Sequence, residues 1–178
     1  MADTELRSAL IVAVPEAVSA VDDWRERTCY GKPSSGLPPH ITILFPFVPP
    51  PRIDDRLIED LSTLFGAFES FRFELRAAER FPAVLYLAPN PADPFLLLID
   101  TVCAAYPDYP PYGGAFDAVV PDLTVAEGDS RTLSDAEADV VPALPMSAEA
   151  RGVLFIEEVE PNSARWQTRA RLPLGQKA

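Results

Sequence analysis

The chain has 178 residues, of which 48% are hydrophobic and 24% are charged, and these values are ordinary for a globular domain. A chain of this length buries roughly 70% of the surface that its unfolded form exposes, so its stability requires neither a disulfide nor a metal ion. The net charge of −12 argues against binding of long nucleic acids, because affinity for a phosphate backbone comes mainly from lysine and arginine, whereas a small phosphate-bearing ligand stays compatible with it.

Apolar spacing predicts strands and helices that alternate along the chain. Strands are expected at 10–14, 39–43, 71–76, 83–88, 121–125, 153–159 and 166–172, and helices at 16–27, 53–68, 94–105 and 134–141. The strands at 71–76 and 83–88 are expected to be a hairpin or neighbours, and Ser134 is the expected N-cap of the last helix. Prolines and glycines at 31–39 and 106–114 predict loops.

This interleaving of helices and strands predicts an α+β fold. We expect one domain over residues 1–178, made of two lobes with a seam near 89–94. The 20 prolines are spread over the connections and form no linker tract, so the composition indicates no other boundary.

A pentapeptide pattern occurs twice, as Pro39-His40-Ile41-Thr42-Ile43 and as Pro121-Asp122-Leu123-Thr124-Val125. Because strand side chains alternate between faces, each copy presents its two polar residues on one face and its apolar residues on the other. Each copy follows a loop that is rich in proline and glycine. The pattern therefore predicts a duplicated lobe that contributes one polar pair from each half of the chain.

The cysteines and the chain start indicate the compartment. Cys29 and Cys103 form no C-x-x-C pair, so we expect small buried apolar residues in a reducing environment, although a bridge between them stays open. The apolar run at 9–14 lacks the basic leader and the length of a signal peptide, and no stretch is long enough to span a membrane. These features predict a cytoplasmic protein without a membrane partner.

The acidic residues do not indicate a metal site. Residues 121–160 hold ten acidic side chains against two arginines, which we interpret as a solvated helix face and loop edges. Their spacing matches no calcium loop, so the sequence predicts no metal ion and no cofactor.

The two pentapeptides resemble the paired His-x-Thr motifs of the 2H phosphoesterase superfamily, in particular its bacterial 2'-5' RNA ligase-like members. The resemblance extends through 38–47, 80–89 and 109–117 and covers most of the chain. It implies a bilobal α+β fold in which two pseudo-symmetric antiparallel sheets face each other across a central cleft, with helices on the outside. It also implies metal-independent chemistry on a 2',3'-cyclic phosphate or a phosphodiester at an RNA terminus.

In this family both histidines act as acid or base and both threonines bind phosphate oxygens. His40, Thr42 and Thr124 match the motif, whereas Asp122 stands where the second histidine is expected. An ordinary aspartate is ionised at neutral pH, so we assign Asp122 as the base and His40, whose pKa a nearby carboxylate would raise, as the acid. The carboxylate would also repel a phosphate, and aspartate is shorter than histidine.

Other assignments stand beside these. Asp122 follows a proline at a loop-to-strand junction, where aspartate commonly caps a turn. Both threonines are also ordinary strand residues. Phe45, Tyr86 and Tyr112 are candidates for stacking on a base, and Arg80 for binding a phosphate, although most aromatic residues are core and most arginines are simply exposed.

Two functions follow from the sequence. One is a 2H-type phosphoesterase that acts as a monomer on a small nucleotide or an RNA terminus. The alternative is a catalytically silent relative that binds a nucleotide or another phosphorylated ligand. An aspartate introduced on purpose to inactivate an enzyme would give the same sequence.

Overall fold

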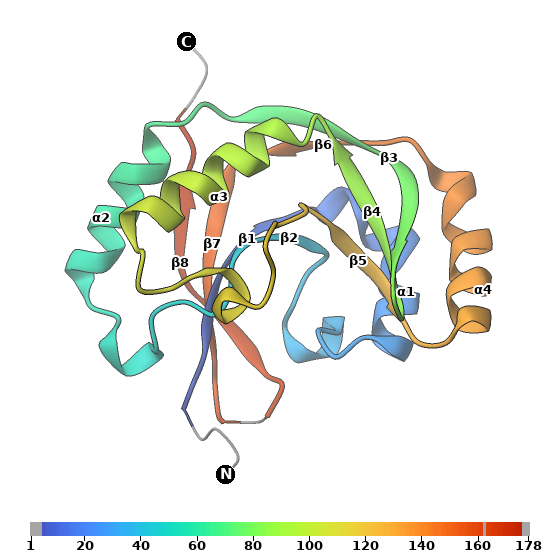
Figure 1. The fold of residues 1–178 in the computed structure, drawn as a ribbon, viewed down its shortest axis with the longest axis horizontal. Coiled ribbons are helices and arrows are strands. Elements are labelled where there is room, and N and C mark those ends of the chain that lie inside the picture. The colour runs from blue at the N-terminus through green and yellow to red at the C-terminus, as the bar shows by residue number, and fades with distance from the viewer. Residues whose placement is uncertain (1–4, 162, 176–178) are drawn as a thin grey trace.

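A computed structural model describes residues 5–161 and 163–175, and within them the chain forms four α-helices and eight β-strands (Figure 1). The strands are β1 (Ser8–Ala13), β2 (His40–Leu44), β3 (Phe71–Phe81), β4 (Val84–Asn90), β5 (Leu123–Glu127), β6 (Met146–Ala150), β7 (Gly152–Glu158) and β8 (Trp166–Pro173). The helices are α1 (Val18–Thr28), α2 (Asp55–Gly66), α3 (Asp93–Ala105) and α4 (Ser130–Val140). The α+β prediction is confirmed.

The strands form one curled antiparallel sheet in the order β6-β3-β4-β5-β2-β1-β7-β8. The contact between β5 and β2 consists of one residue pair, Leu123 and Ile41, whereas every other neighbouring pair of strands shares at least four. The sheet is therefore made of two four-stranded halves that meet at a single point. These halves are the two sheets that the family resemblance implied.

The two halves of the chain repeat the same order of elements, and one helix of each half packs on a strand of the other. The order β1-α1-β2-α2 is followed later by β4-α3-β5-α4. Helix α1 packs on β5, in the second half of the sheet, and α3 packs on β2, in the first half. In Figure 1, α2 and α3 lie on one side of the molecule and α1 and α4 on the other. A bilobal arrangement follows from this symmetry.

One main hydrophobic core contains residues from both halves of the sheet, among them Leu10, Ile41, Leu85 and Leu123, all with no measurable exposure. Helices α2 and α3 contribute Phe65 and Phe95, which are also completely buried. Because removal of this apolar surface from water stabilises both halves together, the strands β2 and β5 are held firmly where they meet. Among residues 5–161 and 163–175, no helix has both the length and the apolarity to cross a bilayer.

Several sequence-based boundaries were wrong by two or more residues, and one strand was missed. Helix α4 begins at Ser130 and not at 134, because the Asp129 carboxylate accepts a hydrogen bond from the Thr132 N–H at 2.8 Å and caps the helix. Strand β3 continues to Phe81, past a register shift that follows Leu75. The buried residues of strand β6 are two alanines, Ala148 and Ala150, which give a weak apolar signal.

We expect the single contact between the halves to be a stability hot spot. Leu123→Ala removes buried side-chain volume at the contact and should lower the free energy of unfolding by about 2–5 kcal/mol. Urea denaturation measures this change. Leu97→Ala is the matched control, because Leu97 is 56% exposed and its loss should cost no more than about 0.5 kcal/mol. Equal effects of the two substitutions would contradict the role of the contact.

Candidate active site

The register of β2 and β5 brings the four polar motif residues together. Ile41 lies opposite Leu123, and extension of this antiparallel register by one residue on either side places His40 opposite Thr124 and Thr42 opposite Asp122, the residue that precedes β5. Ile41 and Leu123 are completely buried in the core, whereas the four polar residues are half-buried. All four polar side chains therefore belong to the other face of the sheet, at the point where its two halves meet.

His40 is oriented by the loop that precedes it. Its Nδ1 lies 2.7 Å from the carbonyl oxygen of Pro38. A carbonyl only accepts, so Nδ1 carries the hydrogen and Nε2 has the free lone pair in the neutral ring. Burial lowers the pKa of His40 to about 4; the hydrogen bond to Pro38 opposes this shift and the charge of Arg25 adds to it. The imidazole is therefore neutral at pH 7.

Burial shifts the pKa of Asp122 in the direction opposite to that of His40. Burial raises its pKa to about 6, and the Thr124 hydroxyl, which donates to Oδ2 at 3.2 Å, partly opposes the shift. Within the described ranges, no lysine, arginine or histidine nitrogen forms an ion pair with this carboxylate. The expectation that the pKa of His40 is raised was wrong, because loss of water around the imidazole is the largest effect and lowers this pKa.

Two adjoining cavities share His40 as a wall. The larger, of about 220 Å³, is lined by His40 and Thr42 together with Arg7, Ala9, Ile11, Tyr30, Gly31, Leu37, Phe45, Tyr112, Ile156 and Trp166. The smaller, of about 110 Å³, is lined by His40 and Thr124 together with Arg25, Cys29, Gly31 and Glu127. The larger cavity is thus mainly apolar and aromatic and the smaller one mainly polar. His40 lines both, Thr42 and Thr124 line one each, and Asp122 lines neither.

Phe45 and Tyr112, two of the candidates for stacking on a base, line the aromatic cavity. The Tyr112 N–H donates to the Phe45 carbonyl oxygen at 2.6 Å, which ties the loop at 106–114 to the end of β2. Their rings lie 6.5 Å apart in an edge-to-face arrangement, and Trp166 lies 6.2 Å from Phe45. Burial and the charge of Asp122 raise the pKa of Tyr112, which places this ring beside the motif.

Tyr86 and Arg80 do not line these cavities. Tyr86 is only 5% exposed, its ring stacks on Phe81 with centroids 4.2 Å apart, and its hydroxyl donates to Glu79 at 2.8 Å. Arg80 forms an ion pair with Glu137 on α4. The structure therefore corrects the sequence-based suggestion for both residues: the face of the Tyr86 ring is covered and the Arg80 guanidinium is engaged elsewhere.

Several residues of the site were missed by the sequence analysis. Arg7 lies over the Phe45 ring at 5.5 Å and pairs with the buried Glu158, and Arg25 lies inside α1. Trp166 was recognised only as the start of the last strand. None of these residues belongs to the repeated pattern, and only tertiary packing brings them to His40.

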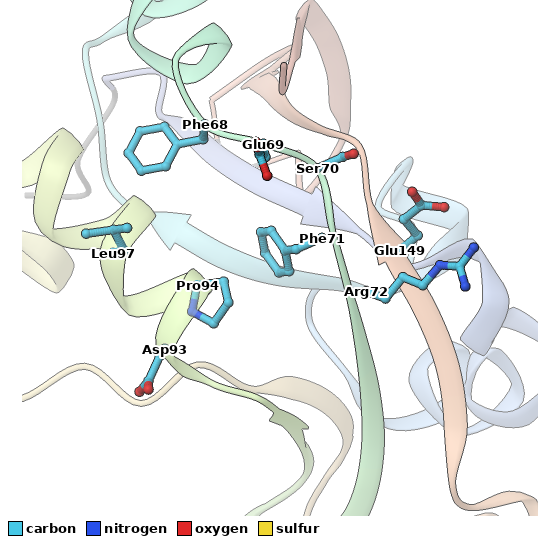
Figure 2. Close-up of a pocket in the computed structure, with 9 residues that line it drawn as sticks. All are labelled: Phe68, Glu69, Ser70, Phe71, Arg72, Asp93, Pro94, Leu97 and Glu149. Carbon is cyan, nitrogen blue, oxygen red and sulfur yellow. The ribbon is translucent and has the colours of Figure 1, made fainter. Parts of the chain in front are cut away.

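A larger cavity lies elsewhere. It has a volume of about 830 Å³, and Figure 2 shows its walls: the segment from Phe68 to Arg72, the start of α3, and Glu149 of β6. The lining includes the carboxylates of Glu69, Asp93 and Glu149 and a single guanidinium, that of Arg72. Three carboxylates against one cation disfavour a phosphate, so the cavities at His40 are the better candidate site.

Within 5–161 and 163–175, no three His, Cys, Asp or Glu side chains are grouped so that they would hold a metal ion.

A profile of the 2'-5' RNA ligase superfamily matches residues 13–161, which include both pentapeptides. The chain belongs to this superfamily. No curated protein sequence matches the chain.

Solved structures share the fold of this 2'-5' RNA ligase superfamily member. TT0787 of Thermus thermophilus has a TM-score of 0.63 and 20% identity, over 97% of this chain and 100% of that chain. E. coli LigT in apo form has a TM-score of 0.60 and 17% identity, over 97% and 99%. E. coli LigT complexed with NADP+ has a TM-score of 0.59 and 18% identity, over 98% and 100%. At these identities the match shows the fold alone.

The raised pKa of Asp122 predicts that the parent and Asp122→Asn differ in stability by an amount that depends on pH. The folded state binds the proton more tightly than the unfolded state, so the carboxyl favours folding at pH 4 and this contribution is lost as the pH rises through about 6. Asp122→Asn should therefore unfold with a free energy close to that of the parent at pH 4, and up to about 3 kcal/mol higher at pH 7.5.

Urea denaturation of both proteins at both pH values measures this difference. The lowered pKa of His40 makes stability rise with pH, but this contribution is present in both proteins and cancels in their difference. Asp108→Asn, on an exposed loop, is the matched control and should change little at either pH. A gain for Asp122→Asn that is the same at pH 4 and pH 7.5 would show that the carboxyl titrates normally.

Proposed function

We propose that this superfamily member is a metal-independent phosphoesterase that hydrolyses a 2',3'-cyclic phosphate or a phosphodiester at an RNA terminus. The observation that carries the proposal is the crossed arrangement of the motif residues: His40 and Asp122 occupy one diagonal of the β2–β5 contact, and Thr42 and Thr124 the other. Diagonal neighbours on adjacent strands are about 7–8 Å apart, which leaves room for a phosphate between an acid and a base.

Hydrolysis of a cyclic phosphate needs three functions around the phosphorus atom. A base removes a proton from water, whose oxygen forms the new bond to phosphorus, while the bond to one ribose oxygen breaks and an acid on the opposite side protonates that oxygen. Hydroxyl donors stabilise the charge on the remaining phosphate oxygens. His40 and Asp122 supply the proton transfers in this proposal, and Thr42 and Thr124 supply the hydroxyl groups.

The pKa values favour roles opposite to those suggested by the sequence. Neutral His40 with its free Nε2 is the base, and protonated Asp122 is the acid. Because the two pKa values differ by about two units, this pair of protonation states outnumbers the imidazolium–carboxylate pair by about a hundredfold. A neutral carboxyl also removes the repulsion that a carboxylate would exert on a phosphate.

The ligands of a related fold support a small phosphate-bearing substrate. E. coli LigT has been solved with 3'-AMP, with ATP and with phosphate. In the present chain, Phe45, Tyr112 and Trp166 form an aromatic wall next to Thr42. Because every nucleobase has a face that stacks on aromatic rings, we propose that this wall holds the base while the motif residues hold the phosphate.

The remaining parts of the proposal concern the state of the protein. We propose that residues 1–178 act as one domain, as a monomer, and in the cytoplasm. The shared core and the exchange of α1 and α3 between the halves of the sheet support the single domain. The monomer and the location stay predictions.

Turnover should be greatest at mildly acidic pH. We expect hydrolysis of nucleoside 2',3'-cyclic phosphates, assayed with all four bases and without added metal, to peak between about pH 4 and pH 6. Above pH 6 the rate should fall about tenfold per pH unit as Asp122 loses its proton. His40→Ala should remove the activity. Turnover that is retained in His40→Ala, or that rises steadily through pH 7, would overturn the proposed roles.

Substitutions of Asp122 distinguish an enzyme from a silent relative. Asn cannot give up a proton, so Asp122→Asn should lower kcat about 10²- to 10⁴-fold and leave KM near the parent value. Asp122→His should stay active, because an imidazolium can also donate a proton, and its optimum should stay on the acidic side of pH 7 because burial lowers the pKa of an imidazole.

The silent alternative predicts a different pattern for the same proteins. The parent would then bind 3'-AMP without turnover, and only Asp122→His would hydrolyse the cyclic phosphates. Unchanged kcat in Asp122→Asn would exclude Asp122 as the acid.

A further inference from the structure

Arg25 is the most deeply buried cation near the site. Its side chain is 2% exposed although it lies on α1, whose other arginine, Arg27, is exposed. Nη1 donates to the Asp22 carboxylate at 2.6 Å. The other terminal nitrogen, Nη2, faces the loop that precedes His40.

Three backbone carbonyls of that loop surround one nitrogen of Arg25. Nη2 lies 2.8 Å from the oxygen of Gly31, 2.9 Å from that of Leu37 and 3.0 Å from that of Pro38. Gly31 stands at the start of the loop and Pro38 near its end, so a single guanidinium ties both ends together. Hydrogen bonds from a charged donor are about twice as strong as neutral ones, and here they hold a segment that has little regular structure.

The Pro38 carbonyl links Arg25 to His40. The same oxygen accepts from Arg25 Nη2 at 3.0 Å and from His40 Nδ1 at 2.7 Å. A carbonyl oxygen has two lone pairs, so it accepts both bonds at once. The position of this oxygen fixes the hydrogen on Nδ1 and the direction of the imidazole ring, and with them the direction of Nε2.

We propose that Arg25 is a positioning residue that orients His40 through the Pro38 carbonyl and thereby selects the Nδ1–H tautomer, with Nε2 free to act on the substrate. The inference rests on the proposed role of His40 as the base. Its geometric part, the tautomer, stands apart from any activity.

The surroundings of His40 hold other titratable groups. Its two cavities contain Arg7, Arg25, Cys29, Tyr30, Tyr112 and Glu127, and Asp122 lies on the diagonal across the strand contact. Arg25 differs from these groups because it alone shares a hydrogen-bond acceptor with the His40 ring in this arrangement.

The test uses the fact that His40 is the only histidine in the chain. Long-range ¹H–¹⁵N spectra of the ring report its tautomer and its titration without overlap. In the parent at pH 7, we expect a neutral ring protonated at Nδ1. In Arg25→Met, which removes all the donors, the spectra should show a mixture of the two tautomers, and the pKa of His40 should rise because a nearby positive charge is gone.

Two further variants separate positioning from folding. Arg25→Lys keeps the buried charge beside Asp22 but loses the planar fork, so it should show an intermediate shift in tautomer. This variant carries the test if Arg25→Met does not fold. Arg27→Met is the matched control: it removes the same charge from the exposed side of the same helix and should leave the His40 spectra unchanged.

Hydrolysis of the cyclic phosphates by the same variants completes the test. We expect kcat to fall about a hundredfold in Arg25→Met and about tenfold in Arg25→Lys, with KM changed less than about threefold, because a misdirected base slows the chemical step. A folded Arg25→Met or Arg25→Lys that keeps the parent tautomer would overturn the inference. If the parent has no turnover, the phosphoesterase proposal fails while the tautomer still decides the role of Arg25.

Discussion

The site depends on one constraint, the single pairing of Ile41 with Leu123 where two half-sheets meet. Antiparallel register at this pair sets which polar side chains are opposite and which are diagonal, and burial of both apolar residues turns the polar ones to the other face. A slip of one residue would send the polar residues into the core. The packing of α1 and α3 across the halves and the common core hold this register in place.

The protonation states at the site follow from burial in an acidic protein. The net charge of −12 leaves few cations to compensate a buried carboxylate, and Asp122 has no ion-pair partner among the residues that the structure describes. Its raised pKa and the lowered pKa of His40 have the same largest cause, loss of water around a group that would be charged. Neutral forms of both groups suit an anionic substrate, which a carboxylate would repel. An aspartate at position 122 is thus compatible with the proposed acid–base chemistry under mildly acidic conditions.

Sequence patterns located most elements because their physical signals are local. The apolar spacing of α2 and α3 and the alternation within β2 and β5 were sufficient for those elements, whereas the alanines of β6 were not. Asp129 rather than Ser134 caps α4, since the cap is decided by which side chain reaches a free N–H. Phe45 and Tyr112 lie in the cavity beside the motif, but Tyr86 and Arg80 do not, because the Tyr86 ring stacks on Phe81 across the β3–β4 pair and Arg80 pairs with Glu137 on α4.

The sequence by itself determined the repeated motif, the α+β class and the four polar residues that form the candidate site, because strand periodicity and loop composition are written in adjacent residues. Only the tertiary structure decided how those residues are arranged across the strand contact, which of them hold protons, and that Arg25 contacts the loop that orients His40. These properties arise from register, from exclusion of water and from contacts between α1 and the loop before β2. Such quantities depend on distances between residues that are remote in sequence, and no local pattern records them.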